Sequence, residues 1–272
     1  MNTLFAVRTR HLDAKTARRL AGNCFNRLEA LEALLSRYRH DSDVSRINQL
    51  KAGESLLISD TTHTCLQRSV EATERTAGLF DVTLGAQTRS TGESSSETTT
   101  PILGQLTLSP TRPEVICNEP GREIDLGGIG KGFALDEMAT ILLDLGASSA
   151  LISCGASTHL AIGEESWQLS LRGDCENRSI ELIDQALSAS GIGEQGAHVV
   201  HPDTGSSPDY HFKRVWVIGP NAALADAFST ASLIMAPAEL DDFAASVRSD
   251  GFEIYTESLS DNTLAKVGGD RA

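Results

Sequence analysis

Apolar residues recur at three- and four-residue spacing in several long segments of the chain, a pattern typical of amphipathic helices. Asp13 is a suitable N-cap for the first of these segments, and Ser42 or Asp43 can begin a short helix after it. Gly146 lies where a helix C-terminus is expected. The pattern predicts long helices over about 13–37, from 60 to near 78, over 133–145, over about 222–235 and over about 239–248.

Shorter apolar runs between these helices predict strands. The segment 79–85 is expected to be a strand or a tight turn, and residues 124–126 the end of a short strand. Because the strands are mixed with long helices and show no regular βαβ order, the sequence predicts an α+β fold. The other predicted strands are 3–8, 149–153, 158–162, 167–172, 179–183, 198–200, 213–218 and 252–257.

One segment, residues 88–101, lacks apolar periodicity and is rich in Ser, Thr and Glu. Such a composition predicts a solvated, flexible loop. Strand-like runs on both sides of it need partners, so we interpret it as a loop within one domain that spans 1–272.

Net charge and cysteine content limit which binding partners, metal sites and compartments fit this chain. The formal net charge of −14 argues against nucleic acid or an anionic membrane as a partner. Five cysteines are scattered and none forms a CxxC pair, so a zinc site is not expected and a reducing compartment fits best. No signal-peptide-like start and no run of eighteen apolar residues is present, which predicts a cytoplasmic protein without a membrane span.

A glycine-rich loop, with glycines at 127, 128, 130 and 132, precedes the helix predicted over 133–145. So many glycines indicate that the backbone needs positive φ or a close approach. The amides of a helix N-terminus favour an anion, and Lys131 adds a positive charge, so the loop is a candidate phosphate cradle. Its spacing matches neither a Walker A loop nor a dinucleotide fingerprint. A tight turn that only lets a strand and a helix pack is the alternative.

A second candidate lies on the helix predicted over 222–235, where Asp226 and Thr230 are four residues apart and share one face. Two hard oxygen ligands in this arrangement suit Mg²⁺, which completes its shell with water and substrate phosphate. The alternative is structural, because an Asp in a first helical turn and a Thr bonded to a carbonyl are both common.

Residues 188–205 form a third candidate, with His198 and His201 beside a Pro-Asp-Thr-Gly turn. On a strand the two imidazoles would point to opposite faces, so we do not predict zinc here. A single histidine next to a phosphate site can act as a base or a donor, and a structural role is the alternative.

Together these segments resemble the ApbE family, the FAD:protein FMN transferases. The matching segments follow the family order: SRYRHDSDVSRIN (36–48), GLFDVTLG (78–85), IDLGGIGKGFALD (124–136), the ASG and HVVHPDTG pair (189–205) and ADAFSTA (225–231). The resemblance implies an α+β, T-fold-related, bilobal architecture with mixed or antiparallel sheets and a ligand cleft between the lobes.

The resemblance also implies the ligands and the reaction. FAD would bind with Mg²⁺ on its diphosphate, and the FMN phosphoryl group would move to a Thr or Ser hydroxyl of a target flavoprotein, with release of AMP. Asp226, Thr230 and the backbone carbonyl of Gly130 would hold the metal, and Asp226 or His198 would accept the hydroxyl proton. The residues expected to contact the nucleotide are Tyr38, Asp81, Asp125, Gly127, Gly128, Lys131 and Ser190.

Several positions depart from the family pattern. His201 stands where the family has Asp, Cys154-Gly155-Ala156 replaces Gly-Gly-Asp, and Asn2 replaces a glycine. The Ser/Thr-rich loop replaces an expected Trp-Gly-Phe segment. The metal helix and the glycine-rich loop are intact. Two further functions therefore stay open: a non-catalytic FAD-binding homologue that acts as a flavin carrier or sensor, and an Mg²⁺-dependent FAD pyrophosphatase.

Overall fold

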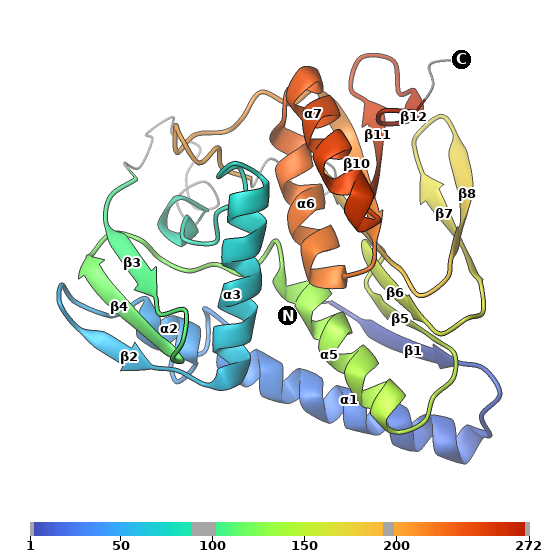
Figure 1. The fold of residues 1–272 in the computed structure, drawn as a ribbon, viewed down its shortest axis with the longest axis horizontal. Helices are drawn as coiled ribbons and strands as arrows, with labels where there is room; N and C mark the ends of the chain where they lie inside the picture. The colour runs from blue at the N-terminus through green and yellow to red at the C-terminus, as the bar shows by residue number, and fades with distance from the viewer. Residues whose placement is uncertain (1–2, 89–101, 193–198, 270–272) are drawn as a thin grey trace.

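The computed structural model describes residues 3–88, 102–192 and 199–269 and has three antiparallel sheets, with helices packed between the largest sheet and the three-stranded one. The predicted α+β class is confirmed. The largest sheet has seven strands in the order β1-β5-β6-β9-β10-β11-β12 (Figure 1). Its strands are β1 (Phe5–Thr9), β5 (Ala150–Cys154), β6 (Thr158–Ile162), β9 (Ala186–Gly191), β10 (Phe212–Gly219), β11 (Glu253–Ser258) and β12 (Leu264–Lys266).

Two smaller sheets complete the strand content. One has the order β2-β4-β3, and the other is the hairpin of β7 and β8. The hairpin packs through a second apolar cluster on one face of the large sheet, where Leu171 and Leu182 of the hairpin meet Leu151 and Trp216 of the sheet. The strands are β2 (Ser55–Leu57), β3 (Gln105–Leu108), β4 (Glu114–Glu119), β7 (Trp167–Arg172) and β8 (Asn177–Leu182).

The helices cover the opposite face of the large sheet. α5 packs on β5 and β6, α6 packs on β9 and β10, and the two helices meet near their N-terminal ends (Figure 1). α1 contacts α5, and α3 joins α6 to the three-stranded sheet. The helices are α1 (Ala14–Leu35), α2 (Asp43–Ile47), α3 (Asp60–Arg75), α5 (Gly130–Asp144), α6 (Ala222–Ile234), α7 (Pro237–Val247) and the short 3-10 helix η1 (Arg248–Asp250).

The predicted helices are confirmed because their signals are local. Asp13 caps α1 by accepting the amides of Lys15 and Thr16, and Ser42 caps α2 through the amide of Ser45. After α5, Gly146 has φ +85°, the left-handed conformation expected of a glycine that ends a helix.

Several strand predictions were wrong. Residues 124–126 form no strand. Segment 79–85 follows the turn alternative of its prediction, and one isolated bridge joins its Leu84 to Glu123. Val199 and Val200 lie outside any strand, and His198 falls outside the described residues. β3, β4, β9 and β12 were not predicted. β9 (ALSASG) consists mostly of small residues, so pairing with β6 and β10 makes it a strand rather than its own propensity.

One apolar cluster runs through both sides of the molecule. It includes Val115 of the three-stranded sheet, Leu31 of α1, Phe228 of α6 and Ile152 of the large sheet. Most of the loop predicted over 88–101 lies outside the described residues. One domain over 1–272 stays a prediction, as does a cleft between lobes.

Candidate functional site

The glycine-rich loop and α6 meet at Asp226. The amide of Gly132 donates to Asp226 Oδ2 at 3.2 Å, and Lys131 Nζ lies 3.2 Å from Asp226 Oδ1. The Asp226 side chain is 1% exposed, so these partners replace the water that would otherwise stabilise a carboxylate. The two segments that sequence analysis assigned to one site therefore share a buried carboxylate.

Close approach explains two of the loop glycines. A Cβ at position 132 would lie 2.0 Å from the carbonyl oxygen of Ala222, at the start of α6. A Cβ at position 128 would lie 3.1 Å from Thr230 Oγ1 and 3.0 Å from the ring of Phe80. None of the four loop glycines has positive φ. Positions 128 and 132 therefore need glycine because α6, and at position 128 also Phe80, comes close, not because of a special backbone conformation.

A second contact fixes α6 against α5. Asp136, one turn after Gly132, accepts the amides of Ala222 and Ala223, both at 2.9 Å. Asn221 caps the same helix end through the amide of Leu224. These bonds satisfy free amides at the start of α6. Gly132 and Asp136 together set the position of α6, and with it the position of Asp226.

Asp136 makes stability depend on pH. Burial raises the pKa of its carboxyl from 3.8 to about 6, although the amides of Ala223 and Ala222 act in the opposite direction. Between these two pKa values the folded protein binds more protons at Asp136 than the unfolded chain does. The contribution of Asp136 to the free energy of unfolding should therefore fall as pH rises from about 4 to 6, by roughly 3 kcal/mol.

Urea titrations of the wild type and of Asp136→Asn at pH 4, 5, 6 and 7 test this expectation. The stability of the wild type relative to the variant should decrease with rising pH and level off above pH 6. A difference that stays constant across the series would contradict the raised pKa.

Hydroxyl groups of α6 and β9 form hydrogen bonds around Asp226, one of them to its carboxylate. Ser188 Oγ donates to Asp226 Oδ1 at 3.0 Å, and Thr230 Oγ1 donates to the backbone carbonyl of Asp226 at 3.1 Å. Ser190 Oγ lies 2.8 Å from Ser229 Oγ and 3.4 Å from Thr230 Oγ1. β9 thus contributes two serines to the polar face of α6, and sequence analysis named only Ser190.

The donor chemistry at this point fits a hard cation. Asp226 offers a carboxylate and Thr230 a hydroxyl, both oxygen donors that Mg²⁺ accepts. Within the described residues no three His, Cys, Asp or Glu side chains group as a metal site. A metal here would therefore use few protein ligands. Lys131, which also donates to the carbonyl of Gly127 at 3.3 Å, now supplies the positive charge next to Asp226.

Three of the predicted nucleotide contacts have other partners. Asp125 accepts Arg37 Nη1 at 2.5 Å and the amide of Gly127 at 3.0 Å. Asp81 accepts the amide of Thr83 at 2.7 Å and pairs with Arg122 at 2.8 Å. The Tyr38 side chain is 89% exposed, and its ring lies 5.7 Å from the Arg37 guanidinium. No contact among the described residues joins Asp81, Asp125 or Tyr38 directly to Asp226.

Sequence analysis missed two residues that hold the glycine-rich loop. Arg37 is 9% exposed and bonds to the carbonyl of Gly85 and to Asp125, so it links segment 78–85 to the loop. The side-chain amide of Asn48 accepts the backbone amide of Ile124 at 2.6 Å and donates to the Ile124 carbonyl at 3.0 Å. Both lie in segment 36–48. The only sequence signal for Arg37 and Asn48 was that both lie within the segment that matches the family motif.

Two departures from the family pattern have defined surroundings. Cys154 is buried, and burial raises the pKa of its thiol to about 11. The charge of Lys131 lowers this pKa and the charge of Asp226 raises it. His201 takes part in the predicted turn: its Nδ1 accepts the amide of Asp203 at 3.3 Å and its carbonyl the amide of Gly205 at 2.9 Å. Cys154 therefore lies beside the central charge pair, whereas His201 stabilises a turn.

The family model and the curated relatives that match this chain belong to one family. The ApbE family model matches residues 1–255. The FAD:protein FMN transferase of Escherichia coli is 24% identical over 94% of this chain and 81% of its own length. The transferase of the same name from Klebsiella pneumoniae is 25% identical over the same shares.

Solved structures show the same fold. The flavin transferase ApbE from Vibrio cholerae superposes with a TM-score of 0.82 at 21% identity, over 98% of this chain and 93% of its own. The flavinyl transferase ApbE from Pseudomonas stutzeri, in its apo form, gives 0.81 at 22% identity, over 98% and 95%. Among the described helices, none is both long and apolar enough to cross a membrane.

Proposed function

Because this chain belongs to the ApbE family, we propose that it is an Mg²⁺-dependent FAD:protein FMN transferase. The single observation that carries the proposal is the bond from the Gly132 amide to Asp226 Oδ2, which joins the phosphate-cradle loop to the candidate metal helix. The buried carboxylate, its hydroxyl neighbours and Lys131 give this junction the groups that a diphosphate with a divalent cation needs.

In the proposed reaction a Thr or Ser hydroxyl of a target flavoprotein attacks the FMN phosphorus of FAD. The new P–O bond forms as the bond to the AMP phosphate breaks, and AMP leaves with the bridging oxygen. Mg²⁺, held by Asp226, Thr230 and the Gly130 carbonyl, would neutralise the charge that develops on the diphosphate. Loop amides and Lys131 would orient the phosphates. Asp226 or His198 would take the hydroxyl proton.

Two rivals make different products from the same substrate. A FAD pyrophosphatase would use water in place of the protein hydroxyl, and a flavin carrier or sensor would leave FAD intact. The change from Gly-Gly-Asp to Cys154-Gly155-Ala156 favours the carrier, because it removes an acid near the site. The retained Asp226 and Thr230 favour the two enzymes.

Incubation of the purified protein with FAD, Mg²⁺ and a flavin-accepting protein domain separates the three functions. Mass spectrometry of the acceptor and chromatography of the nucleotides give the readout. Covalent FMN on the acceptor with AMP in solution supports the transferase. Free FMN with AMP identifies a pyrophosphatase, and unchanged bound FAD identifies a carrier; either result would overturn the proposal.

Lys131 gives a test of the metal assignment that needs no turnover. Its ammonium contacts the Asp226 oxygen that a metal would use, so a cation must displace it or bind beside it. We expect Lys131→Met to bind Mg²⁺ about tenfold more tightly than the wild type in calorimetric titrations without FAD, and to bind FAD more weakly once Mg²⁺ is present.

Lys15→Met on the exposed start of α1 is the matched control, since it removes one lysine charge away from Asp226. Its Mg²⁺ and FAD affinities should equal those of the wild type. If Lys131→Met also left both affinities unchanged, Asp226 would not be a metal ligand.

A further inference from the structure

A cavity of about 280 Å³ lies on the face of the large sheet that carries the β7–β8 hairpin. Along β5, Ile152 and Cys154 point to the core beneath the helices, and Leu151 points to the cluster under the hairpin. Ser153 follows the same alternation as Leu151. The cavity therefore opens on the opposite face of the sheet from Asp226. Asp226, Thr230 and the glycine-rich loop do not line it, and Gly155 at the end of β5 does.

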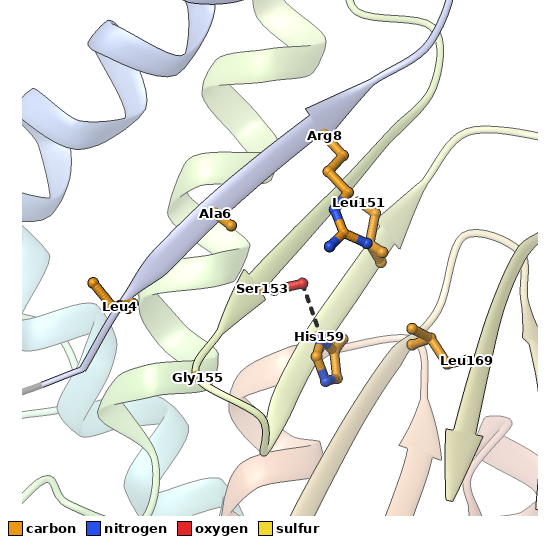
Figure 2. Close-up of a pocket in the computed structure, with 8 residues that line it drawn as sticks. All are labelled: Leu4, Ala6, Arg8, Leu151, Ser153, Gly155, His159 and Leu169. Atoms are coloured by element: carbon orange, nitrogen blue, oxygen red, sulfur yellow. Dashed lines mark hydrogen bonds between the residues drawn. The ribbon is translucent and has the colours of Figure 1, made fainter.

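The cavity has an apolar wall and a polar end. Leu4 and Ala6 lie along the edge strand β1, and Leu169 of the hairpin stands opposite (Figure 2). Leu4 is 86% exposed, so the hairpin leaves this part of the sheet uncovered. At the polar end the side chains of Arg8, Ser153 and His159 project from three adjacent strands on the same side of the sheet (Figure 2).

Arg8 brings an uncompensated positive charge to this end. Among the described residues its guanidinium makes no hydrogen bond or ion pair, whereas that of Arg10, two residues later, pairs with Glu165 at 2.8 Å. In a chain with a formal net charge of −14, a guanidinium without a carboxylate partner beside an apolar wall favours an anion from solution. The planar fork of Arg suits a carboxylate in particular.

The Ser153–His159 pair supplies neutral hydrogen-bonding groups. Ser153 Oγ lies 2.9 Å from His159 Nδ1 across the β5–β6 pair. Burial lowers the pKa of His159, and the charge of Arg8 lowers it further. The imidazole is therefore neutral at pH 7, and Arg8 is the charged group of the cavity.

We propose that this cavity binds a small monocarboxylate with an apolar body. The carboxylate would pair with Arg8 and accept from Ser153 or His159, and the apolar body would lie against Leu4, Ala6 and Leu169. Both halves of the ligand follow from the lining, since an inorganic anion would leave the apolar wall wet and a neutral apolar ligand would leave Arg8 without a partner.

Titration of the full chain with hexanoate, followed by ligand-observed NMR at pH 7.5, tests the proposal. Hexanamide serves as the neutral probe of the same shape. We expect hexanoate to bind at least tenfold more tightly than hexanamide, Arg8→Gln to remove this preference, and Ser153→Ala to weaken hexanoate several-fold. Arg18→Gln on the exposed side of α1 is the charge-matched control and should bind hexanoate as the wild type does.

Three results would overturn the proposal: no hexanoate binding up to millimolar concentration, equal affinity for the two probes, or unchanged hexanoate affinity in Arg8→Gln. Thermal unfolding of each variant confirms that it folds. A titration in saturating FAD and Mg²⁺ separates this site from the transferase site. The affinity for hexanoate should be the same with and without FAD and Mg²⁺. Competition between hexanoate and FAD would place the carboxylate on the other face of the sheet and refute the assignment.

Discussion

Gly132→Ala should destabilise the protein more than any other single methyl group added to the glycine-rich loop. The new Cβ would lie 2.0 Å from the Ala222 carbonyl oxygen and 2.8 Å from the Ala223 Cα. Both are backbone atoms, so no side-chain rotation relieves the overlap, and α5 and α6 must separate. We expect a loss of about 3 kcal/mol or more in the free energy of unfolding and a Tm lower by roughly 6–12 °C.

Separation of α5 from α6 should also weaken the site, because the Gly132 amide would move away from Asp226. FAD binding in the presence of Mg²⁺ should therefore fall together with stability. Denaturant titration and fluorescence titration of FAD measure the two effects.

Gly130→Ala is the matched control on the same helix. A Cβ at position 130 would meet only the Leu126 Cβ, at 3.7 Å, which is an ordinary van der Waals contact. Its stability should stay within about 0.5 kcal/mol of the wild type or rise, because Ala favours a helix over Gly. If Gly132→Ala unfolded at the same denaturant concentration as Gly130→Ala, close approach would not explain the glycine at 132.

Asp226→Ala should abolish Mg²⁺-dependent turnover. The variant removes the carboxylate proposed to hold the metal, and leaves Lys131, Ser188 and the Gly132 amide without their common acceptor. We expect the rate of FMN transfer to fall about a thousandfold or more, from the combined loss of metal and phosphate positioning.

Asp144→Ala provides the comparison, since it removes an exposed acid from the end of α5 and should keep full activity. Far-UV circular dichroism of both variants shows whether the fold survives. A folded Asp226→Ala protein that transfers FMN at the wild-type rate would refute the metal assignment, even if the family function held.

Three residues of segment 36–48, Arg37, Asp43 and Asn48, illustrate how a motif can support a site from behind. Arg37 ties Asp125 to the carbonyl of Gly85, and Asn48 fixes the backbone of Ile124 just before the glycine-rich loop. Asp43 is 6% exposed and accepts the Thr62 hydroxyl at 2.7 Å, so it anchors the start of α3. The segment therefore holds the loop from behind, and we expect substitutions in it to act through loop geometry.

The helices of this protein and its central motifs could be predicted from the amino-acid sequence alone. Helix periodicity, the caps at Asp13 and Ser42 and the stop at Gly146 are local signals within one or two turns, so they are readable without the fold. Asp226 and Thr230 share a face because four residues make about one helical turn. The order of the motifs indicated the family, which the family model over residues 1–255 confirms.

How the motifs meet, and why positions 128 and 132 need glycine, became visible only in the folded chain. Strand β9 exists because β6 and β10 pair with it, and its sequence of small residues does not show this. The contacts of Gly132 with Ala222 and Asp226 join positions about ninety residues apart. Such contacts depend on where two helices cross, which no pattern within either helix records.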